Sequence, residues 1–183
     1  MRHVVFVTGG ARSGKSRFAQ TLAEGWKGRL LYVATGEGRD EEMRRRIAKH
    51  REDRGTRWDT REEPLDLAAA LQGAARPGYG GGLVDCLTLW TSNLLEEAEG
   101  DPETVERRLE DFWAALEAFR GRLCLVTNEV GLGIVPENAL ARRFRDLAGR
   151  VNQGAAARAT EALLVVSGLP LRLKGPTRRG GKR

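Results

Sequence analysis

Short apolar runs rich in β-branched residues recur along the chain, and longer amphipathic stretches separate them. The runs predict buried strands, because consecutive apolar residues suit a strand that is covered on both faces. The predicted strands are residues 3–8, 29–35, 83–87, 122–128 and 162–168, with a short strand at 171–174 after a turn at Leu169–Pro170. The predicted helices are residues 16–26, 39–52, 64–75, 87–119 with a break at 99–102, and 138–160.

Strands that alternate with helices indicate an α/β protein with a mostly parallel central sheet and helices on both faces. Ligands of such sheets bind at the carboxyl ends of the strands. The glycine run at 78–82 is the weak point of this pattern, since it leaves Leu83 and Val84 as the clear strand residues before Asp85. The order of elements therefore directs the search for chemistry to the strand ends.

Length and charge describe a single domain with a basic tail. The 183 residues suit one full core, and we expect a domain over residues 1–174. The formal net charge is +6, but residues 172–183 hold six basic residues and no acidic ones, so residues 1–171 carry 25 of each sign. We expect residues 175–183 to be a disordered tail, and the neutral body argues against a nucleic-acid partner.

Cysteine and apolar residues place further limits on the chain. Cys86 and Cys124 lie in apolar strand-like contexts without a metal-binding pattern, so we expect buried, reduced thiols. No apolar run approaches the ~20 residues of a membrane span, and the apolar residues after Met1 stop at Val7, short of a signal peptide. We therefore expect a cytoplasmic location.

The stretch "GGARSGKS" matches the phosphate-binding pattern G-x-x-x-x-G-K-[ST], with a strand before it and a helix after it. Its glycines let consecutive backbone N–H groups face a phosphate at a helix N-terminus, Lys15 reaches the β- and γ-phosphates, and the Ser16 hydroxyl can bind Mg²⁺. A ligand-free glycine-rich turn is the alternative. The motif predicts a three-layer P-loop fold of the RecA-like type, with phosphate contacts from Gly9, Gly10, Ala11, Arg12, Ser13, Gly14, Lys15 and Ser16.

Two acidic residues lie at the ends of apolar strand runs, on the same edge of the predicted sheet. Asp85 is the candidate second ligand of the metal and a nucleotide contact, or else the N-cap of the following helix. Glu129 is a candidate general base for an incoming hydroxyl, or else a carboxylate paired with a nearby arginine. The sequence leaves both alternatives open.

Beyond the P-loop, the chain resembles the bifunctional adenosylcobinamide kinase and adenosylcobinamide-phosphate guanylyltransferase family of cobalamin biosynthesis over nearly its whole length. The segments that carry the resemblance are "VTGGARSGKSRFA", "YVAT", "RIAKHREDRGTRWDTREEP", "LVDCLTLWTSNLL", "TNEVGLGIVPENALARRFRDLAGRVNQ" and "LVVSGLPLRLK". Lys49 stands where some members have a second histidine, so His50 is the one candidate in this segment.

The resemblance implies two reactions at one nucleotide. A triphosphate, ATP or GTP, with Mg²⁺ phosphorylates the aminopropanol hydroxyl of adenosylcobinamide. His50 then attacks the α-phosphorus of GTP, and GMP passes to adenosylcobinamide phosphate. The resemblance also implies a homotrimer. It implies further nucleotide contacts from Ala34, Thr35, Gly36, Arg51, Glu52, Asp53, Arg54, Glu62 and Asp85.

The chemistry of His50 by itself allows two interpretations. It shares a predicted helix stripe with Met43 and Ile47, which suits a packed structural histidine. Arginines within about one turn favour the neutral imidazole through like-charge repulsion, and a neutral ring nitrogen is a competent nucleophile at pH 7. These arginines are Arg46, Arg51 and Arg54. With the resemblance, we predict that His50 is the guanylylated residue.

Two other functions remain as alternatives. One is a P-loop kinase of another small alcohol, in which His50 is structural and no nucleotidyl transfer occurs. The other is a RecA-like ATPase that binds nucleic acid, against which the neutral body of residues 1–171 argues.

Overall fold

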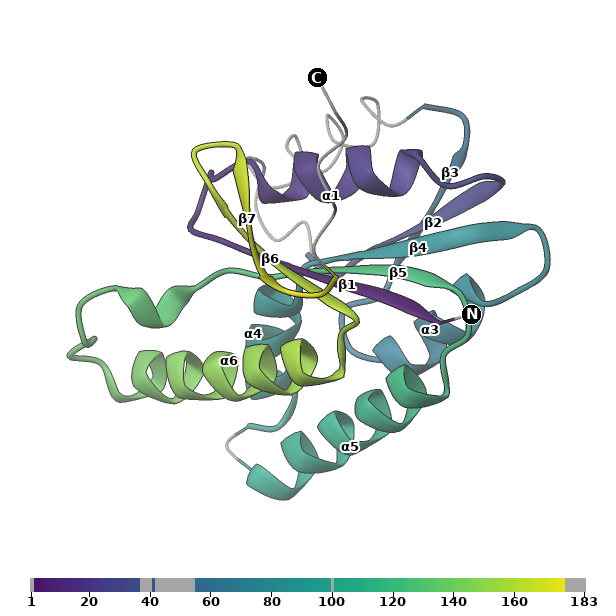
Figure 1. The fold of residues 1–183 in the computed structure, drawn as a ribbon. Helices are drawn as coiled ribbons and strands as arrows, with labels where there is room; N and C mark the ends of the chain where they lie inside the picture. The colour runs from purple at the N-terminus through teal and green to yellow at the C-terminus, as the bar shows by residue number, and fades with distance from the viewer. Residues whose placement is uncertain (1, 37–40, 42–54, 100, 177–183) are drawn as a thin grey trace.

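The computed structural model describes residues 2–36, 41, 55–99 and 101–176. Helices and strands alternate as the apolar pattern predicts (Figure 1). The strands are β1 (His3–Thr8), β2 (Arg29–Ala34), β3 (Trp58–Glu62), β4 (Tyr79–Asp85), β5 (Arg122–Val126), β6 (Glu161–Val166) and β7 (Leu169–Lys174). The helices are α1 (Lys15–Glu24), α3 (Leu67–Ala74), α4 (Leu87–Glu97), α5 (Pro102–Ala118), the 3₁₀ turn η1 (Val130–Leu132) and α6 (Ala139–Arg158).

The strands of the described chain form one seven-stranded sheet in the order β3-β2-β4-β5-β1-β6-β7. Every neighbouring pair is parallel except β6 and β7, which form an antiparallel hairpin. Strand β1 therefore lies between β5 and β6, and β5 separates it from β4. This order brings the carboxyl ends of β1, β4 and β5 to one edge of the sheet.

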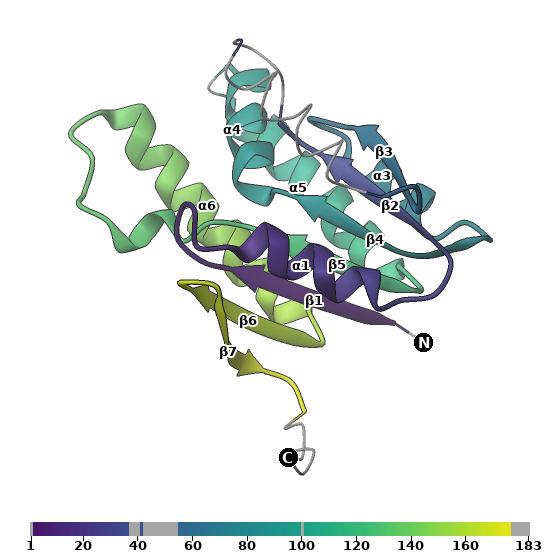
Figure 2. The same ribbon diagram turned by 90° about the horizontal axis from the view of Figure 1, so that it is seen from above.

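Helices cover both faces of the sheet, so the predicted three-layer α/β fold is confirmed. Of the described helices, α1 lies on one face and α3 to α6 lie on the other (Figures 1 and 2). Alternate residues of a strand serve the two cores, because their side chains point to opposite faces. In β1, Val5 and Val7 pack with α1, whereas Val4 and Phe6 join the larger cluster of α3 to α6.

The glycine run at 78–82 corrects the predicted start of the fourth strand. Strand β4 begins at Tyr79 and includes Gly80 and Gly81. A Cβ on Gly80 would lie 1.6 Å from the carbonyl oxygen of Lys27, and one on Gly81 would lie 2.4 Å from the ring of Trp26. Trp26 and Lys27, which follow α1, leave no room for side chains on this part of the strand, so glycine is needed there despite its low strand propensity.

Strand β3, "WDTRE", was not predicted, because its charged residues hide the pattern of a strand. It lies at the sheet edge, where charged residues are common. Arg29 of β2 forms an ion pair with Asp59, and the Tyr79 hydroxyl donates to Asp59 at 2.6 Å. The guanidinium and the hydroxyl lower the pKa of Asp59. Neighbouring strands thus supply the partners that hold β3 in place.

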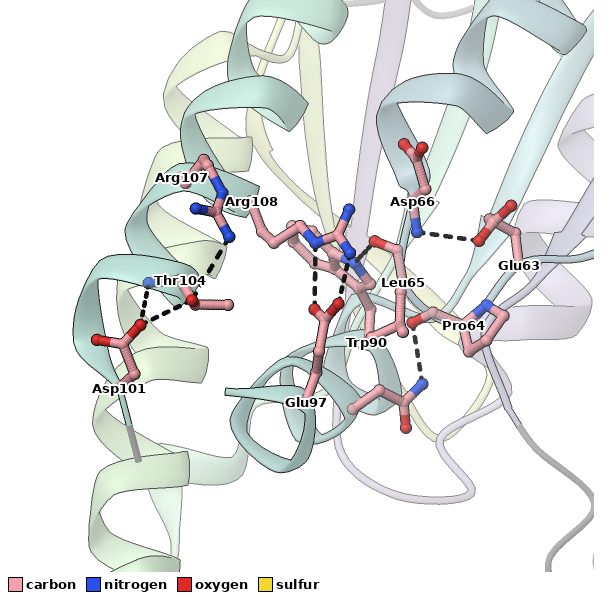
Figure 3. A network of polar contacts seen from close by, with 11 residues as sticks. Glu63, Pro64, Leu65, Asp66, Trp90, Glu97, Asp101, Thr104, Arg107 and Arg108 are labelled. Carbon is pink, nitrogen blue, oxygen red and sulfur yellow. Dashed lines mark hydrogen bonds and ion pairs between the residues drawn. The ribbon is translucent and has the colours of Figure 1, made fainter. Parts of the chain in front are cut away.

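The predicted helix over 64–75 starts later than expected. Helix α3 begins at Leu67, with Asp66 as N-cap accepting from the N–H of Ala69 at 2.9 Å. Pro64 lies in the connection between β3 and α3. This connection is held to α4, because the indole N–H of Trp90 donates to Leu65 O at 2.8 Å (Figure 3). The predicted helix over 39–52 lies outside the described residues apart from position 41.

Both cysteines are free and buried, as predicted. Burial raises the pKa of the Cys86 thiol to about 11 and raises the pKa of Cys124 as well, so both stay protonated near neutral pH. Among the described residues, no helix is long and apolar enough to cross a membrane.

Candidate nucleotide site

The loop between β1 and α1 takes a shape that requires glycine at two positions. A Cβ on Gly9 would lie 2.4 Å from the carbonyl oxygen of Val165, so the backbone passes directly against β6. Gly14 has a φ of 90° and precedes the first helical residue, Lys15. A left-handed residue here suits glycine and turns the chain sharply into the helix. Residues 9–14 thus wrap around the amino end of α1.

Both neighbours of β1 hold this loop. From β5, the N–H of Glu129 donates to Gly9 O at 3.2 Å. From the β6–β7 turn, the N–H of Gly168 donates to Ser13 O at 2.8 Å. These bonds fix the loop backbone from two sides. The first N–H groups of α1 have no intrahelical acceptors, which makes the start of this helix a site for a phosphate.

Lys15 and Ser13 carry the buried polar side-chain groups of this loop. Lys15 is buried, and its ammonium donates to Gly10 O at 3.2 Å, so the side chain folds back over the loop. The Ser13 hydroxyl is buried and has no hydrogen-bond partner among the described residues. A buried hydroxyl without a partner is unfavourable, and a bound ligand would satisfy it. Ser16 lies in the first turn of α1.

A cavity of about 470 Å³ opens beside the loop, between α1 and the β6–β7 turn. Its size lies within the range of small-molecule sites. Two arginines on its wall, Arg12 and Arg17, give it positive charge, and Phe18 supplies an aromatic ring. The remaining lining residues are Ser13, Gly14, Thr21, Ser167 and Gly168.

Glu129 lies directly against the phosphate loop. Its Oε1 accepts from the Thr8 hydroxyl at 2.5 Å and from the Asn152 amide at 3.3 Å. Its partners in the described chain are thus neutral donors, and an arginine partner, the alternative raised by the sequence, is not among them. Oε1 is occupied by these bonds, which orient the carboxylate. Such a carboxylate can accept a proton from a hydroxyl that approaches the loop.

Sequence analysis missed the residues that orient Glu129. Thr8 and Asn152 are buried, and Asn152 also receives a bond from Thr127 at 2.8 Å and donates to Asn128 O at 3.0 Å. The signal for part of this network was the threonine that ends each of three apolar runs, "FVT", "VAT" and "LVT". Asn152 lies inside a long helix, and nothing local marks it.

Asp85 ends β4 on the same edge as the phosphate loop. The Tyr32 hydroxyl donates to its Oδ2 at 2.8 Å, and Oδ1 has no partner among the described residues. The alternative role of Asp85 as a helix N-cap is wrong: Cys86 occupies the N-cap position of α4, and no side chain caps this helix. The carboxylate is therefore available at the carboxyl edge.

Other predicted contacts lie at the carboxyl ends of β2 and β3. Ala34 ends β2, and Glu62 is exposed at the end of β3. The Thr35 hydroxyl is buried, donating to Cys86 O and accepting from Cys86 N, both at 2.7 Å. Gly36 faces Leu89, whose Cδ1 would lie 3.2 Å from a Cβ there.

One amide links the ends of β2 and β3. Asn93 of α4 donates to Thr35 O at 2.8 Å and to Pro64 O at 3.1 Å. The backbone that carries Thr35 and Glu62 is therefore fixed relative to α4. His50 and residues 51–54 lie outside the described residues, so their place relative to the phosphate loop stays a prediction.

Comparison with known proteins matches nearly the whole chain to one family of sequences. The sequence model described as "Cobinamide kinase / cobinamide phosphate guanyltransferase" matches residues 5–173. The bifunctional adenosylcobalamin biosynthesis protein CobP of Pseudomonas aeruginosa is 47% identical over 169 residues, 92% of this chain and 96% of that protein. The bifunctional adenosylcobalamin biosynthesis protein CobU of Salmonella typhimurium is 44% identical over 93% of this chain and 99% of that protein.

Solved structures show the fold alone. An ATPase from the type III secretion system of pathogenic bacteria matches with a TM-score of 0.54 and 10% identity, over 93% of this chain and 56% of that one. The likeness agrees with a P-loop fold, and at this identity it carries no statement about substrates.

Proposed function

The chain belongs to the cobinamide kinase / cobinamide phosphate guanyltransferase family, and we propose that its single phosphate loop serves both reactions of that family. The enzyme phosphorylates cobinamide and transfers a guanylyl group to cobinamide phosphate. The observation that carries the shared-site proposal is the phosphate loop at Gly9–Ser16 with Glu129 beside it: the backbone N–H of Glu129 donates to Gly9 O, and its carboxylate is oriented by Thr8. Both reactions hold a nucleoside triphosphate by its phosphate tail, so one loop suffices.

In the kinase reaction, the hydroxyl oxygen of the aminopropanol arm of adenosylcobinamide attacks the γ-phosphorus. The bond to the β-phosphate oxygen breaks, and the nucleoside diphosphate leaves. Glu129 accepts the proton of the hydroxyl, a role supported by its position beside Gly9 and its orientation by Thr8 and Asn152. Lys15 stabilises the negative charge that moves onto the leaving oxygen.

In the guanylyl transfer, a neutral ring nitrogen of His50 attacks the α-phosphorus of GTP, and pyrophosphate leaves. A phosphate oxygen of adenosylcobinamide phosphate then attacks the same phosphorus, and the nitrogen–phosphorus bond breaks. His50 is regenerated, and adenosyl-GDP-cobinamide is the product. A neutral imidazole suits this role at pH 7 without a separate strong base.

The oxygen groups at the carboxyl edge suit Mg²⁺. This ion takes a few hard oxygen ligands from a protein and keeps phosphate and water oxygens for the rest. Ser16 would bind it through its hydroxyl and Asp85 through Oδ1, directly or through water. Among the described residues no group of three or more acidic, histidine or cysteine side chains could hold a metal alone. When bound, Mg²⁺ neutralises charge on the phosphates.

The nucleotide takes its remaining contacts from two regions. The cavity lined by Arg12, Arg17 and Phe18 adjoins the loop and suits part of the nucleotide by charge and size. The predicted contacts from Ala34, Thr35, Gly36 and Glu62 lie at the ends of β2 and β3, and those from Arg51, Glu52, Asp53 and Arg54 follow His50 in the chain. The Thr35 side chain would act through the backbone that it holds, because its hydroxyl is already bonded to Cys86.

Partners and location are proposed on the same basis. The small-molecule partners are ATP or GTP, adenosylcobinamide and its phosphate. A homotrimer, a cytoplasmic location and the absence of a nucleic-acid partner stay predictions. Sedimentation analysis would check the first, and salt-titrated binding to DNA and RNA would check the last.

Intact-protein mass spectrometry after mixing with GTP and Mg²⁺ tests the proposal most directly. A covalent GMP adduct that disappears when adenosylcobinamide phosphate is added would support the two-step transfer. If no GMP adduct forms but the protein still phosphorylates adenosylcobinamide, the protein is a kinase alone and His50 has a structural role.

A further inference from the structure

Exposed apolar side chains follow Glu129 along the chain. Leu132 is 82% exposed, Ile134 96% and Val135 60%, and Leu140 at the start of α6 is also exposed. Most large apolar side chains of a folded domain are at least partly covered, and clustered exceptions mark binding surfaces. We call residues 132–140 the apolar loop. It projects beyond the carboxyl edge of the sheet, on the side of the phosphate loop (Figures 1 and 2).

The apolar loop has a held backbone. The guanidinium of Arg142 donates to Pro136 O at 3.0 Å and to Glu137 O at 2.5 Å. Asn138 caps α6, with its side chain accepting from the N–H of Ala141 at 3.0 Å. The apolar side chains are therefore presented on a backbone tied to α6, which lowers the entropy that a ligand must overcome on binding.

The apolar loop lies within reach of the phosphate loop. Glu129, which donates to Gly9 O, directly precedes η1. Ile134 is five residues further along, so its Cα lies at most about 18 Å from that of Glu129 even if the chain were fully extended. A large molecule bound on the apolar loop can thus place a short arm beside Glu129.

We propose that the apolar loop binds the corrin macrocycle of the cobinamide substrate. This inference rests on the proposed function, because it places the remainder of the molecule whose hydroxyl is phosphorylated. A cobalt corrinoid with its axial ligand is larger than the cavity of about 470 Å³ beside the phosphate loop. In this proposal the macrocycle lies on the surface, and its aminopropanol arm enters the site.

The chemistry of the apolar loop fits this ligand. The rim of a corrin carries methyl groups, which Leu132, Ile134 and Val135 can cover. Asn128, next to Glu129 in the chain, adds a buried amide oxygen without a partner in the described chain.

The test compares two double serine variants. Leu132→Ser with Ile134→Ser removes apolar surface from the loop. Leu171→Ser with Leu173→Ser makes the same change at exposed positions of β7 and serves as the control. The measurements are the Kd for adenosylcobinamide from calorimetry, the KM values for adenosylcobinamide and GTP, formation of the GMP adduct, and oligomeric state by light scattering.

In the loop variant we expect the Kd and KM for adenosylcobinamide to rise on the order of tenfold or more. The KM for GTP and the GMP adduct should match wild type, and the control should bind adenosylcobinamide as wild type does. Wild-type affinity in the loop variant would overturn the proposal. A changed oligomeric state in the loop variant alone would overturn it too, by assigning the loop to a second copy. Wild type that binds no adenosylcobinamide would instead refute the proposed function.

Discussion

The hydroxyl of Thr8, the last residue of β1, donates to Oε1 of Glu129, which follows β5, at 2.5 Å. The two residues are 121 positions apart in sequence and meet because β1 and β5 are parallel neighbours. The bond fixes a carboxylate at the point where the phosphate loop begins. Glu129 is thereby oriented by side chains of the fold itself.

Replacing Glu129 by glutamine should slow phosphorylation of adenosylcobinamide by roughly 10²–10⁴-fold, because an amide cannot accept the hydroxyl proton. Formation of the GMP adduct should persist, since that step uses His50 as its nucleophile. Initial rates with each substrate check this. Glu110→Gln, on an exposed position of α5, makes the same chemical change away from the site and should match wild type. If Glu129→Gln phosphorylates adenosylcobinamide at close to the wild-type rate, Glu129 is not the general base.

Lys15→Ala should impair both reactions, because both place the phosphate tail of a triphosphate in the same loop. We expect kcat of the kinase to fall by about 10²–10³-fold through lost stabilisation of transferred charge. The rate of adduct formation with GTP should fall as well. Normal turnover in either assay would contradict a shared loop. Circular dichroism should confirm that the variant keeps its fold.

His50→Ala should abolish the covalent GMP adduct while leaving most kinase activity, because the kinase step uses the hydroxyl of the substrate. GTP labelled at the α-phosphate should label wild type, and γ-label should not remain on His50. The label should be lost in acid and survive alkali, as expected of a nitrogen–phosphorus bond. His3→Ala is the matched control: His3 begins β1, at the opposite end from the phosphate loop, and bonds to Glu161 at 2.9 Å. An adduct retained in His50→Ala would refute the assignment.

Gly80→Ala should destabilise the fold by about 1–3 kcal/mol or more, because its Cβ would lie 1.6 Å from Lys27 O. Gly149→Ala should act in the opposite direction, since a Cβ there meets nothing within 4 Å in the middle of α6. An alanine in a helix interior is about 0.5–1 kcal/mol better than glycine. Thermal and urea unfolding of the two variants would show the difference. Equal stability would mean that β4 and Lys27 can separate at little cost.

Deleting residues 175–183 should leave nucleotide binding and both activities nearly intact, because these residues include no large apolar side chain. The deletion removes four basic residues, which lowers the formal net charge from +6 to +2. Arg172 would lose its hydrogen bond to Pro176 O but keep its ion pair with Glu161, at 3.1 Å. Unfolding curves and both assays check this, and a large loss of activity would show that the tail binds something.

The sequence by itself determined the elements whose cause is local. A β-branched apolar run followed by "GGARSGKS" and an amphipathic stretch predicts strand, phosphate loop and helix, because glycine freedom and apolar periodicity act within a few residues. The same reasoning placed Asp85 and Glu129 on one edge, since parallel strands share their direction. It failed at β3 and at the glycines of β4, where neighbouring strands and Trp26 decide the conformation.

Only the tertiary structure decided which residues meet. Thr8, Glu129 and Asn152 come from the end of β1, the end of β5 and the middle of α6, and no spacing in the sequence relates them. Their contact follows from strand order, which places β5 beside β1, and from the packing of α6 on the sheet. Strand order is a property of how buried surfaces match across the whole domain. Local sequence alone therefore does not determine the strand order.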